Sequence, residues 1–295
     1  MPSPSIASEI ARYLRTGDAD IDARAWPGDI FERGKRQHAD LRDALVREVR
    51  RLASGRSHAP VPRNVGFDFT RAKVEPMVRG LFVRDEQETV LATFERSVVY
   101  VTSETIESIV SNERWERSAW DLANMYLLSV GAKLLGTKAA RIVGMSEETT
   151  CYVSPEYFVE DDPFADFIVH EAAHIFHNCK RRTIGLHETR RKEWLLDIEF
   201  TKRETFAYSC EAYARIVARA KSIAERRALA VEYGSKKRIS AEHVDPMEVA
   251  SILTEATSAR NGWKVILARC APIAKPRSIA QLVRDLNANA LATER

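Results

Sequence analysis

Glycine, proline and cysteine are all scarce in this chain of 295 residues. It has 12 Gly and 11 Pro, both below their usual shares of about 7% and about 5%. Few chain breakers favour helices over an all-β sandwich, which needs a turn after each short strand. The four cysteines form no Cys-x-x-Cys pair and are too few for a disulfide framework. We therefore expect free thiols in a reducing compartment.

Long apolar runs and a surplus of one charge are also missing. No segment approaches the roughly 18 to 20 apolar residues of a membrane span, and the N-terminus lacks the apolar core of a signal peptide. We therefore expect a cytoplasmic protein with no membrane partner. The 45 Lys and Arg residues against 42 Asp and Glu are too balanced for a dedicated nucleic-acid binder. No helix-turn-helix signature is visible either, so a nucleic-acid partner is disfavoured.

Apolar residues at helical spacing predict helices at the start of the chain. Ile6, Ile10 and Leu14 share one helix face, and a second run of apolar residues repeats this spacing between 41 and 52. The prolines of the segment 58–63 then interrupt the helical pattern. We therefore divide the chain into a helical N-terminal segment (1–60) and one larger domain (61–295).

The fold class predicted for the chain is α+β, mainly helical. Clusters of β-branched and aromatic residues predict strands at 81–83, 97–102 and 149–158, and Pro155 in the last of them favours a sheet edge. The larger domain is expected to have three parts in chain order: a sheet-containing part (about 61–160), two helices (about 163–220) and a helical C-terminal part (about 221–295).

The chemistry of the chain is concentrated in the motif His170-Glu171-Ala172-Ala173-His174. Residues four apart share a helix face, so both imidazoles can converge on one Zn²⁺ at about 2.0 to 2.1 Å. Glu171 lies on the adjacent face, where it can act as general base on a zinc-bound water. The motif therefore predicts two zinc ligands and one catalytic carboxylate. The alternative is that both histidines are ordinary residues of an amphipathic helix.

A catalytic zinc site needs a third protein ligand and keeps its fourth position for water. His177 lies on the same face, but about 10 Å along the helix from His170. That is too far to share the ion, so we expect a pocket residue or a cation at the helix end. The stretch 202–216 is the better source, because Glu204 and Glu211 lie near one helical stripe among small residues.

With His-Glu-x-x-His on one helix and a glutamate on a later one, the chain resembles the gluzincins, a group of zinc metallopeptidases. More narrowly, Glu204-Thr205-Phe206-Ala207 is similar to the Glu-x-x-Ala of regulatory metallopeptidases that cleave phage and stress-response repressors. Those enzymes carry Asn and Ala where Tyr208 and Glu211 stand here. The resemblance covers about residues 149–216. It implies a zincin-like fold, with the sheet packed on the His-Glu-x-x-His helix and Glu204 as third ligand.

Two other carboxylates compete with Glu204 for the third position. Eighteen residues separate Glu193 from His174, the gap found in gluzincin aminopeptidases, although the Gly-x-Met-Glu-Asn signature of those enzymes is missing. Glu211 competes because it shares the stripe of Glu204. The alternative for each glutamate is a solvated ion pair with a nearby Lys or Arg.

Four further residues near the motif have two interpretations each. Tyr208, Tyr213 or His187 could stabilise the oxyanion that develops during peptide hydrolysis, or could simply pack. Cys151, in the strand before the motif, could bind zinc as a removable inhibitory thiolate, or could be a buried strand residue.

These observations predict a zinc metallopeptidase that acts on a peptide or protein substrate. The edge strand at 149–158 would pair with the extended substrate, and Glu171 would pass a proton from water to the leaving amine. The rival is a zinc-stabilised regulatory or interaction protein with little or no turnover. Glu171 argues against that rival, because a structural site needs no base and usually closes its fourth position with Cys or His.

Overall fold

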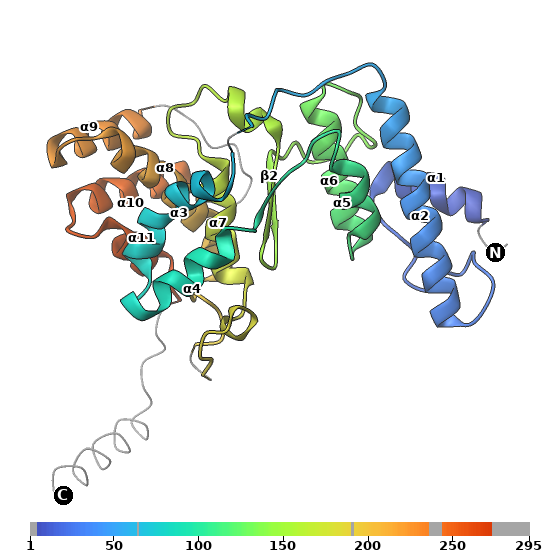
Figure 1. Ribbon diagram of the computed structural model, residues 1–295, viewed down its shortest axis with the longest axis horizontal. Coiled ribbons are helices and arrows are strands. Elements are labelled where there is room, and N and C mark those ends of the chain that lie inside the picture. Colours follow the sequence, from blue (N-terminus) through green and yellow to red (C-terminus); the bar gives the residue numbers. More distant parts are fainter. Residues whose placement is uncertain (1–4, 64, 190–191, 236–243, 273–295) are drawn as a thin grey trace, which may run out of the picture.

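A three-stranded sheet lies between two groups of helices (Figure 1). The computed structural model describes residues 5–63, 65–189, 192–235 and 244–272. The fold is α+β and mainly helical, as the sequence predicts. The helices and strands in chain order are α1 (Ile6–Thr16), α2 (Ile30–Ala53), α3 (Phe67–Leu81), α4 (Arg84–Phe94), β1 (Val98–Tyr100), α5 (Ile106–Asn112), α6 (Glu116–Ser129), β2 (Gly144–Glu147), β3 (Thr150–Val153), α7 (Phe167–Asn178), α8 (Arg203–Arg219), α9 (Ile223–Gly234), α10 (Pro246–Ser258) and α11 (Gly262–Cys270).

The first group of helices consists of α1, α2, α5 and α6. Leu41, Leu45 and Val49 bury the apolar face of α2 against the other three helices. The Tyr13 hydroxyl donates to the carbonyl oxygen of Glu116 at 2.8 Å, which ties α1 to the start of α6. The predicted N-terminal helices are confirmed, and their periodic apolar faces form this core.

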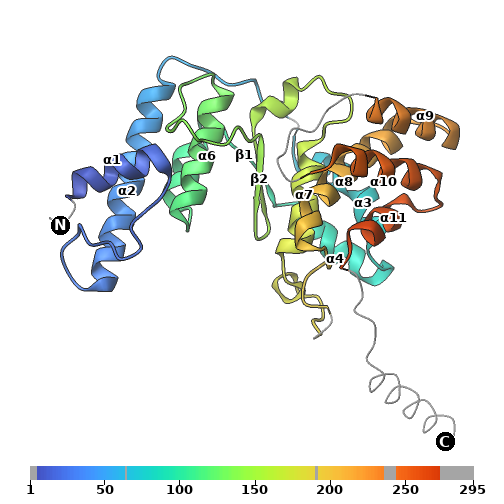
Figure 2. The same cartoon turned by 180° about the vertical axis from the view of Figure 1, so that it is seen from behind.

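The second group of helices surrounds α7. Its core includes side chains of α3, α4, α8, α10 and α11, and both views place α7 between β2 and α8 (Figures 1 and 2). Ala172 and Ala173 of α7 are fully buried, as are Ala207 and Cys210 of α8. These small side chains let neighbouring elements approach α7 closely, which determines how the functional residues meet.

The sheet has the order β1-β3-β2, with β1 parallel and β2 antiparallel to β3. Successive side chains of a strand point to opposite faces. Accordingly, Cys151 and Val153 belong to the core around α7, whereas Tyr152 packs against the N-terminal helices. The sheet therefore connects the two cores.

The prediction of an edge strand over 149–158 is wrong in two respects. β3 is the central strand, and it ends at Val153 because a 3₁₀-helix begins at Pro155. The strand expected at 81–83 is also absent. Leu81 is the last residue of α3, and its apolar side chain is buried as part of that helix. The strand at 97–102 is confirmed as β1.

The two hydrophobic cores do not divide the chain at a single point. The helices α5 and α6 follow α3, α4 and β1 in the chain, yet they pack with α1 and α2. The segment 58–63 does interrupt the helices as expected, between α2 and α3. The domain boundary at residue 60 stays a prediction.

Two expectations about composition can be compared with the fold. All four cysteines lie within the described part of the chain, and each is a buried free thiol. Among the described helices, none has the length and apolar character needed to cross a lipid bilayer.

Candidate metal centre

Helices α7 and α8 bring together His170, His174 and Glu204. The two histidines stand one turn apart on α7, and Glu204 lies in the first turn of α8. One donor atom from each of the three side chains lies within 4.8 Å of the other two. Glu204 follows His174 by thirty positions in the chain, yet the three residues form one group because the two helices pack side by side.

The spacing of the donor atoms is that of a tetrahedral ion site. The two Nε2 atoms of His170 and His174 lie 3.2 Å apart. The Glu204 carboxylate oxygens lie 3.6 Å from His170 Nε2 and 3.4 Å from His174 Nε2. Ligands at 2.0 to 2.1 Å from a tetrahedral zinc would stand about 3.3 Å from one another. Oε2 of Glu204 is the oxygen nearer His170 and Oε1 is the one nearer His174, so the carboxylate faces both imidazoles at distances close to those of a tetrahedral zinc site.

The Nδ1 atom of His170 faces the carboxylate of Glu211 at 3.1 Å. The other oxygen of that carboxylate accepts the Asp166 backbone N–H at 2.8 Å, and the Asp166 side chain pairs with Lys73 Nζ at 2.8 Å. A carboxylate accepts but does not donate, so it holds the proton of His170 on Nδ1 and leaves the Nε2 lone pair free for a metal. Glu211 therefore orients the His170 imidazole and stands outside the group of three donors.

The Nδ1 atom of His174 faces the Nε2 atom of His177 at 2.9 Å, and His177 Nδ1 lies 3.0 Å from Asn178 Oδ1. Burial lowers the pKa of His177 to about 3, with the positive charges of His174 and Arg203 acting in the same direction. A neutral His177 that donates to Asn178 accepts from His174, so the Nε2 lone pair of His174 also points at the ion site. His177 is thus a buried partner of a ligand.

The charges of the centre favour a cation. Burial lowers the pKa of His170, but hydrogen bonding to Glu204 and Glu211 outweighs it and raises that pKa to about 10. Burial of Glu204 acts to raise its pKa, yet hydrogen bonds with both histidines hold the pKa below its usual range. Metal binding at this centre would therefore compete with protonation of His170.

The centre is open to solvent on the side of Glu204. The Glu204 side chain keeps 46% of its accessible surface, whereas those of His170 and His174 keep 13% and 11%. Among the described residues, the three donors are the only group of this kind. A bound ion would therefore have a fourth position that a water or substrate can reach.

Glu171 lies beside this group and is not part of it. Its side chain is buried, with 6% of the residue exposed, and α7 packs against β2 on that side. Burial raises the pKa of the Glu171 carboxyl, although the positive charges of His170 and His174 oppose the shift. A carboxylate beside the donors is suited to accept a proton rather than to bind the ion.

The other predicted candidates are spread over different environments. Glu193 forms an ion pair with Lys180 at 2.6 Å and stands outside the donor group. The Tyr208 ring lies edge-on to His170, 4.6 Å between centroids, and burial raises the pKa of its hydroxyl to about 12. Tyr208 is thus the aromatic residue that adjoins the centre.

Three candidates lie away from the donor group. Tyr213 packs edge-on against Trp263 at 4.8 Å and fills a core position. His187 is exposed in the loop after α7. Cys151 is fully buried in β3, where burial raises the pKa of its thiol well above the usual value, so a thiolate ligand is disfavoured.

Sequence reasoning did not find Asp166 and Lys73, which hold Glu211 in place. Asp166 immediately precedes α7, and an acid at that position usually caps a helix. Here its side chain makes no capping hydrogen bond and pairs with Lys73 of α3 instead. Nothing in the local sequence of α3 indicates this contact.

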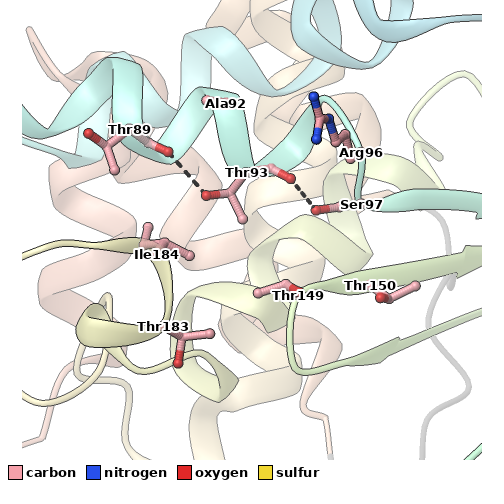
Figure 3. Close-up of a pocket in the computed structure, with 9 residues that line it drawn as sticks. All are labelled: Thr89, Ala92, Thr93, Arg96, Ser97, Thr149, Thr150, Thr183 and Ile184. Carbon is pink, nitrogen blue, oxygen red and sulfur yellow. Dashed lines mark hydrogen bonds between the residues drawn. The ribbon is translucent and has the colours of Figure 1, made fainter.

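A separate surface cavity of about 570 Å³ lies at the start of β1 (Figure 3). Hydroxyl side chains dominate its lining, and Arg96 is the charged residue among them. The Thr93 and Ser97 hydroxyls already donate to the backbone carbonyls of Thr89 and Thr93. The cavity contains none of the three donors and no carboxylate or imidazole, so the metal centre is the better candidate for catalysis.

Comparisons with protein-family models, with curated proteins and with solved structures give no match to this chain.

Proposed function

We propose that this chain is a zinc-dependent peptidase of the gluzincin kind with a zincin-like arrangement around α7. The observation that carries the proposal is the convergence of His170, His174 and Glu204, in which one donor atom from each side chain lies within 4.8 Å of the other two. Two imidazoles and one carboxylate are a ligand set that catalytic zinc uses, with a fourth position left open. The outer contacts of Glu211 and His177 support it, since both leave a histidine Nε2 lone pair directed at the site.

The chain's own residues would divide the work of hydrolysis. Zinc bound at this centre would polarise the scissile carbonyl and acidify the attacking water. Glu171 would accept the proton of that water and return it to the leaving amine, which is the task its buried position beside the donors favours. Tyr208, next to His170, is the residue best placed to donate to the developing oxyanion.

The substrate would be an extended peptide segment paired with β2. The Ser154 N–H donates to the Val143 carbonyl at 2.8 Å, and hydrogen-bonded pairs alternate along an antiparallel ladder. It follows that the N–H and C=O groups of Gly144 and Ser146 point away from β3, toward the open edge. An unpaired edge offers main-chain hydrogen bonds to any extended peptide. The edge strand is thus β2 and not the segment 149–158.

The rival function is a zinc-stabilised regulatory or interaction protein. The open fourth position and the buried Glu171 both favour the peptidase, because a structural zinc site uses neither. The edge strand next to the centre adds a place for a peptide, which a purely structural site also does not need.

The test combines metal analysis with turnover. We expect about one zinc per chain, loss of the metal in His170→Ala and His174→Ala, and cleavage within a library of quenched fluorescent octapeptides. Glu171→Gln should keep the zinc and abolish cleavage, because an amide of the same volume accepts no proton. Zinc retained by the double histidine variant would refute the centre. Full zinc without any cleavage by the wild-type chain would favour the rival.

A further inference from the structure

The carboxylate of Glu171 lies directly against Gly144 of β2. A Cβ atom added to Gly144 would stand 2.4 Å from Glu171 Oε1, 2.8 Å from its Cγ and 2.9 Å from its Cδ. Carbon atoms in proteins pack at about 3.5 to 4.0 Å, so no other residue fits here while Glu171 keeps its place. All three contacts are to the same side chain, so Gly144 and Glu171 are directly coupled.

Backbone conformation does not explain this glycine. Five other glycines have a positive φ, and Gly144 is not one of them. It lies in a regular strand, paired with Val153, and glycine weakens a strand because it adds no side chain to pack. Glycine in a strand often marks the close approach of another group, and here that group is the Glu171 carboxylate.

The neighbouring residue on the same strand face extends this surface. Gly144 and Ser146 are two apart in β2, so both face α7, while Met145 packs against the N-terminal core. Hydrogen bonding by the Ser146 side chain acts on the Glu171 carboxyl. A bare Cα and a small hydroxyl therefore let the Glu171 carboxylate lie close against β2.

We propose that Gly144 is a positioning residue for Glu171. Because Gly144 has no side chain, the Glu171 carboxylate can lie against β2, beside the backbone groups that face the open edge. The catalytic meaning of this contact rests on the proposed function. The same residue would then do two things: its main chain faces the open edge where a peptide can pair, and its Cα surface seats the base. The base and the paired substrate would be aligned by one residue.

The first test is Gly144→Ala, with Gly34→Ala as the control. A Cβ at Gly34 in α2 meets nothing within 4 Å, so that variant should keep wild-type kcat and zinc binding, while alanine inside a helix should raise the urea midpoint slightly. Gly144→Ala should fold and bind zinc within about twofold of wild type, because it touches no donor. Displacing a catalytic group by about 1 Å costs up to roughly 100-fold in rate. We therefore expect kcat on the best library octapeptide to fall by about 10- to 100-fold with little change in KM.

The second test needs no activity. In the Glu171→Ala background the atoms that the new Cβ would meet are gone, so adding Gly144→Ala should not lower the urea midpoint. In the wild-type background the same change should lower it. Equal shifts in both backgrounds would overturn the proposal, and so would a Gly144→Ala enzyme with unchanged kcat.

The two tests separate this proposal from the peptidase proposal. Suppose that the wild-type chain cleaves nothing, while Gly144→Ala lowers the urea midpoint only where Glu171 is present. The contact between Gly144 and Glu171 is then supported, and the peptidase proposal fails. If the wild-type chain cleaves peptides and Gly144→Ala behaves like Gly34→Ala in both tests, the contact fails alone.

Discussion

Each side chain of the centre has its orientation set by a partner behind it. His170 is backed by Glu211, and His174 is backed by His177. Both partners are buried, so neither imidazole can turn without leaving a polar group unpaired in the interior. The donor atoms are thus prearranged by contacts that involve no ion, which would lower the cost of ordering them around a metal.

The prediction at this scale concerns the third ligand. Glu204→Ala should weaken zinc binding by more than the roughly 10- to 100-fold typical of a lost outer partner, because it removes a metal bond. Glu211→Gln should fall within that range, since the amide keeps the volume but cannot accept from both His170 and Asp166. Glu193→Ala is the matched control and should bind like wild type, as its partner is Lys180.

Chelator competition at one pH, with all three variants side by side, would measure these differences. If Glu193→Ala alone released the zinc, the centre described here would be wrong, and the spacing would belong to the aminopeptidase-like branch of the gluzincins. If Glu211→Gln released it more readily than Glu204→Ala, Glu211 would be the ligand.

At the scale of elements, the centre depends on how closely α7 and α8 approach. Glu204 lies in the first turn of α8, and the fully buried Ala207 lies about one turn further along the same helix. A carboxylate on a separate helix reaches the two histidines only if the interface is lined by small side chains. The interface therefore sets the distances between the donors.

We expect Ala207→Leu to force the two helices apart. Overpacking of a dense core costs about 1 to 3 kcal/mol of unfolding free energy, and the longer separation should also weaken zinc binding. Ala218→Leu, at an exposed position of the same helix, is the control and should change neither. Urea denaturation and zinc titration of the two variants would check this. An unchanged zinc affinity in Ala207→Leu would contradict the prediction, because it would show that the helix interface accommodates a larger side chain without moving the donors.

At the scale of the whole molecule, β2 connects the centre to the N-terminal helices. Gly144 and Ser146 face α7, whereas Glu147 faces the N-terminal helices. The Glu147 carboxyl lies against Glu113, the residue that follows α5, and accepts a hydrogen bond from the Ser118 hydroxyl at 3.3 Å. Burial, followed by the hydrogen bond and negative charge of Glu113, raises the pKa of Glu147 from its ordinary 4.5 to about 7. Glu148 adds to the negative charge there, while Arg42 donates to the Glu113 carbonyl oxygen.

This carboxyl pair should make the stability of the fold depend on pH. The folded pKa of Glu147 lies above the unfolded one, so the folded state holds the proton more tightly between about 4.5 and about 7. Protonated Glu147 therefore contributes its full stabilisation of the folded state below about pH 4.5. This contribution is lost as the pH rises through about 7. Glu147→Gln, which cannot ionise, should lose less stability than wild type between pH 5 and pH 8.

Urea midpoints at those two pH values, for wild type and variant, would measure the difference. Glu48→Gln is a suitable control, because Glu48 is paired with Arg51 on α2 and its pKa is lowered. An identical pH dependence in wild type and Glu147→Gln would exclude the pair as its source.

The spacing of residues along the sequence was enough to determine which side chains share one face of a helix. His170 and His174 are four positions apart, so any helix brings them to one face, and the sequence suffices to predict that the two imidazoles lie together with Glu171 beside them. The periodic faces of α1 and α2 were predicted for the same reason. The mainly helical α+β class follows from the few breakers and the sparse strand-like segments.

Only the tertiary structure shows which of the three glutamates lies beside the two histidines. Glu204, Glu193 and Glu211 are all plausible by spacing, and the choice depends on the packing of α8 against α7, which no local pattern encodes. The strand β2 was missed because Gly144–Glu147 contains no β-branched residue, and it is a strand because β3 supplies its hydrogen-bond partners. The place of β3 at the sheet centre has the same origin, since strand order is a property of pairings between distant segments and not of the residues within one strand.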